Sequence, residues 1–311
     1  MRTVAFMPVT HGSGREFIQI AVIGKALAKR YQRVYISAFN KYFAEALAAE
    51  YENVTVIDGA EVQAFWHEHW NERQYIDVFS EDPYNMNNFS MRRLNIYDAW
   101  GQLFELPSLG MGTLPLLRAP QAVQDGAANF AREHKKFIIF QRAGGQNPVG
   151  ARRDEKGHIC QPYNTNEIGL KRSYPLSRSE ELVHLFRKEG YEVLQYCLEN
   201  EPHVKGAIYL SQEQNQLFYM ELAKYADGVV TIDSSLMHLT IANCKKMVVI
   251  WGQTSVKSFG YGKAVNIQLN DDSTFGGPSM TGVQLFPEVK FPTAEAVFDA
   301  YKKGLIDNDG E

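Results

Sequence analysis

The stretch IDSSLMHLTIANCKKMVVIWGQTSVKSFGYG, residues 232–262, predicts one repeat of a parallel α/β sheet. It continues the apolar run GVVT, so its first residues end a buried strand, and KMVVIWG forms a second apolar strand after a helical segment. An acid, two hydroxyls and a histidine stand between the two strands, and a loop with several glycines follows the second. Strand, helix and strand in this order favour a parallel sheet, because parallel strands need a long crossover between them.

The same alternation recurs along the chain in two blocks. The first block has predicted strands at 3–9, 33–39 and 54–59 and predicted helices at 17–31 and 41–51. The second has predicted strands at 135–142, 192–198, 228–233 and 246–252 and predicted helices at 177–191, 215–227, 234–245 and 294–305. Between them, residues 61–120 are less regular, with one predicted helix at 95–106. We therefore predict two α/β domains, 1–130 and 131–311, and the last helix is a candidate to pack back on the first.

Length and composition are those of an ordinary globular protein. The chain has 311 residues, of which 45% are hydrophobic and 22% are charged, enough for two domains of about 150 residues. A net charge of −4 gives no basic excess that would make nucleic acid or an anionic membrane the default partner. The three cysteines fit neither a metal site nor a disulfide framework, and no apolar run approaches the roughly 18 residues of a membrane span. We expect reduced thiols, a cytoplasmic location and no integral membrane contact.

Polar side chains gather where two neighbouring strands of the predicted sheet end. They are Asp233, Ser234, Ser235 and His238 after the first strand and Gly252, Thr254 and Ser255 after the second. Ligands of parallel α/β sheets bind beyond the carboxyl ends of the strands, and the N-terminus of a helix attracts anions. Two such strand ends are suited to a diphosphate. The alternatives are that Asp233 and Ser234 merely cap the helix and that His238 is a core histidine.

These residues resemble the C-terminal signature of glycosyltransferase family nine, the lipopolysaccharide heptosyltransferases and their relatives. That signature runs Asp-Ser/Thr-Gly-x-x-His-Leu-x-x-Ala, then a strand, then Phe-Gly-x-Thr and a Gly-Tyr-Gly-like element. The matching residues are Asp233, Ser234, His238, Leu239, Ala242, Gly252, Thr254, Tyr261 and Gly262. The chain departs from the signature at Ser235, where the family has glycine, and at Trp251, where it usually has phenylalanine.

The resemblance implies a GT-B fold, in which two Rossmann-like parallel-sheet domains face each other across a cleft. It implies that the C-terminal domain binds a nucleotide-sugar donor, that the N-terminal domain binds the acceptor, and that an inverting transfer proceeds without metal or cofactor. His67 and His69 lack further ligands at a metal-binding spacing. The expected acceptor is a bacterial surface glycan. The alternatives are a hydroxymethylated base of bacteriophage DNA and an inactive nucleotide-sugar-binding module.

Weaker similarities to the family extend the predicted donor site upstream. LKRSYPLSRSEELVHLF, residues 170–186, is similar to the family's Lys-x-Trp-Pro segment, and Arg172 stands at the phosphate-binding lysine. Arg142, directly after a strand, is a second candidate cation for the leaving group. In the family an acid after the strand that matches 192–198 contacts the nucleoside. Glu199 and Glu201 are both options for this acid, with Glu201 preferred.

The predicted general base lies in the first loop. An inverting transfer needs a base that takes the proton of the acceptor hydroxyl. The resemblance implies an acid in this loop: counting back from the helix gives Glu16, and counting forward from Gly14 gives Arg15. Only Glu16 can act as a base, and His11 in the same turn is the alternative. Gly14 and Arg15 are predicted to contact the acceptor. Glu16 is equally suited to a plain helix N-terminus.

The long loop at 143–174 is net basic in an acidic protein. It leaves a predicted strand end, and its Arg152 and Arg153 are candidate contacts for a polyanionic acceptor, either a phosphorylated glycan or DNA. The alternative is a disordered surface insert.

Overall fold

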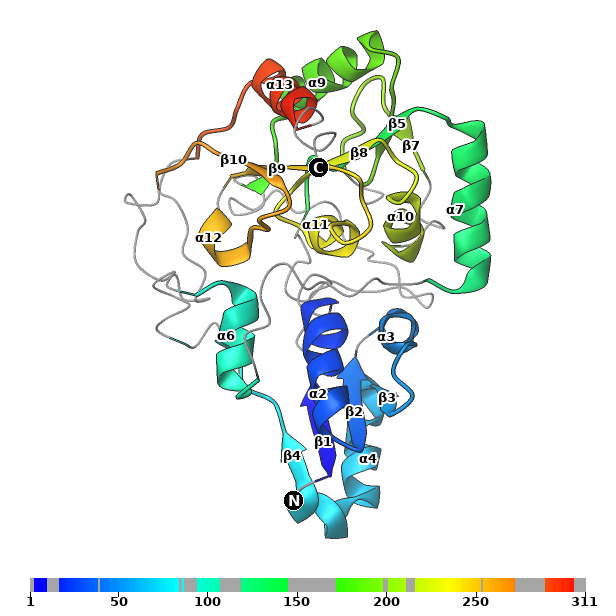
Figure 1. Ribbon diagram of the computed structural model, residues 1–311, viewed down its shortest axis with the longest axis vertical. Helices are drawn as coiled ribbons and strands as arrows, with labels where there is room; N and C mark the ends of the chain where they lie inside the picture. Colours follow the sequence, from blue (N-terminus) through cyan, green and yellow to red (C-terminus); the bar gives the residue numbers. More distant parts are fainter. Residues whose placement is uncertain are drawn as a thin grey trace, which may run out of the picture. The chain divides into compact units, whose positions relative to one another are not determined.

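The chain forms two compact α/β units, each with one parallel β-sheet (Figure 1). This computed structural model describes residues 3–9, 17–38, 40–83, 86, 94–106, 119–144, 172–197, 201–210, 216–252, 254–271 and 289–304. The units are Met1–Gln121 and Ala122–Glu311. The predicted site residues outside the described ranges are His11, Gly14, Arg15, Glu16, Arg152, Arg153 and the option Glu199. The prediction of two parallel-sheet α/β domains is confirmed.

The N-terminal unit is built on a four-stranded sheet of order β3-β2-β1-β4, in which every neighbouring pair is parallel. Its elements are β1 (Val4–Pro8), η1 (Gln19–Gly24), α2 (Lys25–Arg30), β2 (Arg33–Ala38), α3 (Lys41–Ala48), β3 (Val54–Asp58), η2 (Gly59–Glu61), α4 (Val62–Glu68), η3 (Trp70–Tyr75), β4 (Ile76–Val78) and α6 (Ile96–Leu103). The sequence had described residues 61–120 as less regular, with a surface helix as the alternative to a metal site around His67 and His69, and α4 is that helix.

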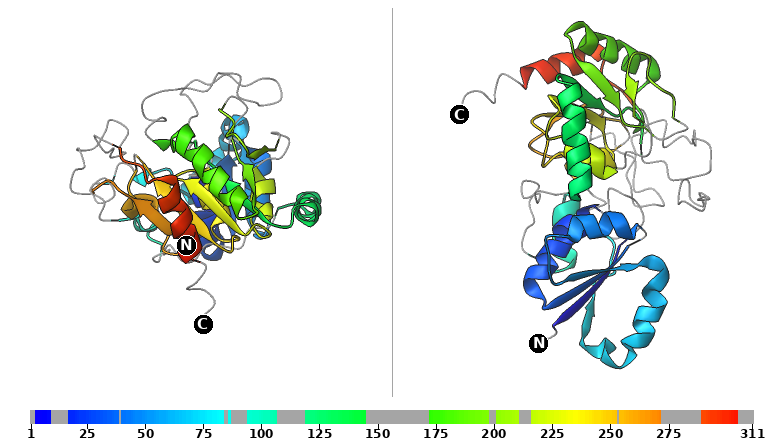
Figure 2. Two further views of the ribbon diagram at one scale, coloured as in Figure 1. Left: turned by 90° about the horizontal axis from the view of Figure 1, so that it is seen from above. Right: turned by 90° about the vertical axis from the view of Figure 1, so that its right-hand side faces the viewer.

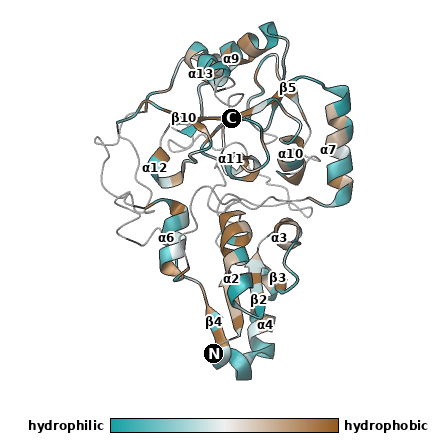
Figure 3. Cartoon of the chain, in the orientation of Figure 1, coloured by the Kyte–Doolittle hydropathy of each residue, from teal (hydrophilic) through white to brown (hydrophobic). Residues whose placement is uncertain are grey.

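Helices cover both faces of this sheet (Figure 2). On one face, Phe6 of β1 packs against Phe65 of α4, with ring centroids 5.2 Å apart, and Ile57 and Ile76 join the same cluster. On the other face lies η1, a π-helical segment whose residues are all buried and which is apolar in Figure 3. The period-two alternation of side chains along a strand therefore accounts for both layers.

The C-terminal unit has a six-stranded parallel sheet of order β10-β9-β8-β5-β6-β7. Its elements are α7 (Gln121–Glu133), β5 (Phe137–Phe140), α9 (Leu176–Lys188), β6 (Glu192–Gln195), β7 (Ile208–Tyr209), α10 (Gln216–Leu222), β8 (Gly228–Ile232), α11 (Ser235–Thr240), β9 (Met247–Trp251), α12 (Val256–Phe259), β10 (Val265–Gln268) and α13 (Ala294–Lys303). Read from the β7 edge, this is the Rossmann strand order, and the order reverses between β5 and β8.

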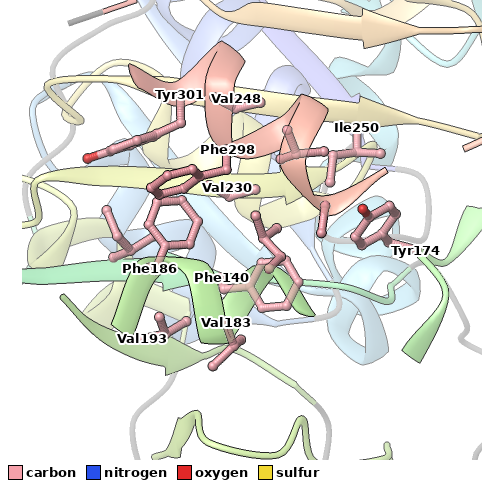
Figure 4. Close-up of a cluster of buried hydrophobic side chains, with 14 of the residues drawn as sticks. Phe140, Tyr174, Val183, Phe186, Val193, Val230, Val248, Ile250, Phe298 and Tyr301 are labelled. Atoms are coloured by element: carbon pink, nitrogen blue, oxygen red, sulfur yellow. The ribbon is translucent and has the colours of Figure 1, made fainter. Parts of the chain in front are cut away.

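Two layers of helices enclose the C-terminal sheet. Helices α9 and α13 cover one face and α10 and α11 the other (Figure 1). Phe186 of α9 meets Phe298 and Tyr301 of α13 edge-on, with ring centroids 5.1 and 5.0 Å apart, above Val230 and Val248 of the sheet (Figure 4). The last helix therefore packs within the C-terminal unit, where its apolar stripe completes the core. The sequence had made it a candidate to pack on the N-terminal domain.

Helix α9 ends at a position that only glycine occupies easily. Gly190 follows it with φ of +83°, the left-handed conformation that commonly ends helices. Across the described ranges, no helix is both long enough and apolar enough to cross a membrane.

Candidate functional site

The ends of β5 and β8, the two strands between which the sheet order reverses, are joined by buried polar side chains. The Ser234 hydroxyl donates to Gln141 Oε1 at 2.5 Å, and the Thr231 hydroxyl donates to the same oxygen at 3.2 Å. All three residues are buried. The network therefore lies where the strand order reverses, the place at which sheets of this order bind their ligands.

Gly144 lets the backbone after β5 approach this network closely. A Cβ atom at Gly144 would lie 2.8 Å from Gln141 Nε2 and 3.2 Å from Ser234 Cβ. Real Cβ atoms do not come this close to their neighbours, so a side chain here would displace Gln141.

Arg172, Asp233 and Thr254 form a second cluster at the same edge of the sheet. Arg172 Nη2 donates to the Asp233 carbonyl at 2.7 Å and to Asp233 Oδ2 at 3.1 Å. The Thr254 hydroxyl donates to the same Oδ2 at 2.6 Å. Asp233 and Thr254 are buried, whereas the Arg172 side chain is 22% exposed. Within the described ranges, Arg172 Nε is buried without a hydrogen-bond partner. The cluster therefore keeps a cationic donor at the edge of the sheet.

His238 is buried beside this cluster in its neutral form. Burial lowers the pKa of its imidazole to about 4, with Arg172 acting in the same direction and Asp233 opposing it. Its Nδ1 lies 2.5 Å from the Tyr261 hydroxyl. A buried and hydrogen-bonded ring is what the core-histidine alternative predicts. The same ring is also close enough to Arg172 and Asp233 to interact with both charges.

The serines differ in what their hydroxyls do. Ser234 occupies the N-cap position of α11 but makes no capping bond, because its hydroxyl is bonded to Gln141. The Ser235 side chain lies near the Tyr196 hydroxyl. Ser255 caps α12 by accepting from Lys257 N at 3.2 Å. Simple capping therefore explains Ser255 and does not explain Ser234.

A second arginine, Arg142, lies at the carboxyl end of the same sheet. Arg142 follows β5 and is buried, and its Nε donates to the Tyr174 carbonyl at 3.2 Å. Arg142 and the buried Glu201 both influence the Cys197 thiol after β6, whose pKa burial raises to about 12. Arg142 and Glu201 therefore both lie towards the end of β6. Gly252, on the β9 side, accepts from Asn270 Nδ2 at 3.0 Å through its carbonyl.

Every described residue of the predicted donor site thus comes from a segment at the carboxyl end of one sheet. Direct contacts join Arg172, Asp233 and Thr254, whereas Glu201 lies apart from them near Cys197. Sequence reasoning missed Gln141. It follows the apolar run FIIF directly, as Asp233 follows VVTI, and this is the signal that could have found it. Among the described residues, no three His, Cys, Asp or Glu side chains gather as a metal site requires.

Comparisons with known proteins agree with the fold. Residues 215–274 match the family model described as glycosyltransferase family 9 (heptosyltransferase), and this stretch contains all the predicted site residues from Asp233 to Ser255. No curated protein sequence matches the chain significantly.

Solved structures of similar fold include three bacterial proteins. The ADP-heptose lipopolysaccharide heptosyltransferase II of E. coli is 13% identical, with 98% of this chain and 99% of that chain covered and a TM-score of 0.61. A family 9 glycosyltransferase of Veillonella parvula is 11% identical, with 99% of each chain covered and a TM-score of 0.63. The heptosyltransferase WaaC of E. coli, solved with ADP-2-deoxy-2-fluoro heptose, is 9% identical, with 97% and 99% covered and a TM-score of 0.51. The resemblance to glycosyltransferase family nine is therefore confirmed, in sequence over residues 215–274 and in a heptosyltransferase-like GT-B fold over nearly the whole chain.

Proposed function

We propose that the chain is a metal-independent, inverting glycosyltransferase that moves a sugar from a nucleotide-sugar donor to a hydroxyl acceptor. The observation that carries the proposal is the cluster of Arg172, Asp233 and Thr254 at the carboxyl end of the C-terminal sheet. Sugar transfer releases a nucleoside diphosphate, and the negative charge that develops on it needs a preorganised cation. The Arg172 guanidinium at the carboxyl end of the sheet is suited to this task. Its buried Nε–H donates to none of the described residues and so is available to a ligand.

The members of the cluster have different proposed roles. Arg172 contacts the diphosphate. Asp233 holds Arg172 through two oxygens and so fixes the direction of the remaining guanidinium N–H groups. Thr254 supports Asp233 from the neighbouring strand. His238, neutral at physiological pH, adds a hydrogen-bonding group without adding charge.

The first candidate donor is an ADP-activated sugar. The E. coli relative solved with a heptose analogue binds an ADP derivative, and we extend this donor class to the present chain as a proposal. Thermal unfolding in the presence of ADP, GDP, UDP, CDP or dTDP tests it. A ligand at about a hundred times its Kd adds roughly 2.7 kcal/mol to the free energy of unfolding, which should raise Tm by about 5–10 °C. A chain that none of these nucleotides or their sugar derivatives stabilises would contradict the proposal.

The proposed acceptor is a bacterial surface glycan, with modified bacteriophage DNA as the alternative. Release of nucleoside diphosphate should be followed with a lipopolysaccharide core fragment and with hydroxymethylcytosine-containing duplex DNA as the two acceptors. Reversing Arg152 and Arg153 to Glu should raise the acceptor KM, more at low salt than at high salt, because exposed charges are screened. Donor binding without release on either acceptor would favour the inactive binding module.

Glu16 is the proposed general base, with His11 as the alternative. Glu16→Gln should lower kcat by roughly a hundredfold or more, because positioned bases typically contribute that much. The donor Kd, measured by calorimetry, should stay nearly constant. Full activity of Glu16→Gln together with an inactive His11→Ala variant would move the role to His11.

A further inference from the structure

Arg142 carries a buried positive charge that the proposed roles have not used. The residue is only 6% exposed, although it lies two positions after the end of β5, at the carboxyl end of the sheet. Within the described ranges its Nη1 is buried and has no hydrogen-bond partner. A buried guanidinium with an unused donor is unfavourable unless another group satisfies it, and an anionic ligand is such a group.

Arg142 is held in place by the segment that also carries Arg172. Tyr174 N donates to the Arg142 carbonyl at 2.7 Å, and Arg142 Nε donates back to the Tyr174 carbonyl at 3.2 Å. Tyr174 is itself fully buried in the core, where its hydroxyl donates to the Pro292 carbonyl at 3.1 Å (Figure 4). The two guanidinium groups are therefore fixed by one short segment anchored in the core.

The two arginines lie near the ends of different strands. Arg172 is bonded to Asp233, which follows β8. Arg142 lies near Cys197, which follows β6 and also interacts with Glu201. In a sheet of Rossmann order, the diphosphate crosses the point of reversal, and an acid shortly after the second strand contacts the ribose. Because β6 is that second strand, the nucleoside belongs on the side of Arg142, and the sugar belongs on the side of Arg172.

We propose that Arg142 binds the phosphate of the donor that is nearer the nucleoside, while Arg172 binds the phosphate nearer the sugar. This inference rests on the proposed function, because it divides that donor's diphosphate between two residues. It predicts that a nucleoside monophosphate depends on Arg142 alone and that a nucleoside diphosphate depends on both arginines.

Titration calorimetry with AMP and ADP tests this division. If another nucleoside diphosphate stabilises the protein more than ADP in the thermal unfolding experiment, that diphosphate and its monophosphate are used in place of ADP and AMP. Arg142→Met should weaken both AMP and ADP by about 10- to 100-fold, the scale of a hydrogen bond to a charged group. Arg172→Ala should weaken ADP by a similar factor and leave AMP within about threefold of wild type.

Arg178→Met is the matched control. Arg178 also donates from its guanidinium to backbone carbonyls, those of Phe291 and Pro292, which lie in the segment before α13 and next to the Tyr174 anchor. Its substitution should leave AMP and ADP affinity unchanged. Equal loss in Arg178→Met and Arg142→Met would show that Arg142 acts only by supporting the fold.

A folded Arg142→Met protein that binds AMP as wild type does would overturn the inference. If this variant does not fold, Arg142→Lys keeps the charge but loses the forked geometry. It should still bind AMP several-fold more weakly, and wild-type affinity in it would overturn the inference equally. A wild-type protein that binds AMP and ADP through these arginines but transfers no sugar contradicts the proposed function alone. A wild-type protein that binds neither nucleotide contradicts both.

Discussion

The amino end of the C-terminal sheet buries one cation, Lys246, and the carboxyl end holds two, Arg142 and Arg172, and the two ends compensate the charge differently. At the amino end, Lys246 Nζ lies 4.0 Å from the centre of the Tyr301 ring, and the Tyr301 hydroxyl donates to the Asp227 carbonyl at 3.2 Å. At the carboxyl end, Arg172 is paired with the Asp233 carboxylate, and Arg142 is bonded to a backbone carbonyl.

This difference in charge compensation suggests different roles: Lys246 supports the fold, whereas the arginines at the carboxyl end are suited to an anionic ligand. Burial lowers the pKa of Lys246 to about 8, so this amine can lose its proton when its surroundings do not compensate the charge. A guanidinium stays charged in proteins, so the charge at the carboxyl end has to be matched by an anion. A sheet with arginines at its carboxyl end and a lysine over an aromatic ring at its amino end keeps its permanent positive charge at the carboxyl end, where we propose that the donor binds.

The largest effect should come from removing the anion at the carboxyl end. Asp233→Ala leaves the Arg172 charge and the Thr254 hydroxyl without their common acceptor, which should cost about 2–4 kcal/mol, reduced from a fully buried pair by the exposure of Arg172. Urea unfolding measures the loss. At the amino end, Asp227→Ala removes only an acceptor of the Phe137 N–H and should cost about 1 kcal/mol. Equal losses of unfolding free energy in Asp233→Ala and Asp227→Ala would show that the two ends do not differ in this way.

Removing the cation at the carboxyl end should weaken ligand binding, whereas removing the cation at the amino end should not. Arg172→Ala should weaken nucleoside diphosphate binding by about 1.5–3 kcal/mol, because a charged hydrogen bond is lost. Lys246→Met should leave this affinity within about twofold, since Lys246 lies at the opposite end of the sheet. Calorimetry on both variants decides the matter, and an unchanged Kd in Arg172→Ala would remove Arg172 from the site.

His238 should make the carboxyl end sensitive to acid. Its pKa is lowered to about 4 in the folded protein from an ordinary 6.5, so between these values the unfolded state binds more protons. Stability should therefore fall as the pH drops from 6.5 towards 4, by up to about 1.4 kcal/mol per pH unit from this group. His238→Gln should lose that part of the slope in urea titrations at several pH values. An identical slope in the two proteins would mean that His238 is not titrating in this range.

The smallest effect is expected from Lys246→Met. Methionine keeps the length and the contact with the Tyr301 ring without a charge to desolvate, so stability at pH 7 should change by about 1 kcal/mol or less. The folded pKa of about 8 lies below the unfolded 10.5, so wild-type stability should rise relative to the variant between pH 8 and 10. If the free energies of unfolding of the two proteins change in parallel between pH 8 and 10, Lys246 stays charged throughout this range.

Much of this architecture follows from local patterns in the chain. Apolar runs such as GVVTI and MVVIW predict buried strands, and the amphipathic segments between them predict helices, because both depend on periodicities within a few residues. The polar residues at the strand ends, from Asp233 to Ser255, are visible in the same way. Short elements such as β4 and β7 escaped prediction, since three or two residues carry no period.

The sequence by itself therefore determined the fold class and the set of residues available at the strand ends. Only the tertiary structure decided which of them meet. Arg172 reaches Asp233 across 61 positions of the chain, and Ser234 bonds to Gln141 across 93 in place of capping its own helix. These contacts exist because β5 and β8 are neighbours where the strand order reverses. That order depends on how helices and strands pack together over the whole unit, and no local pattern contains it.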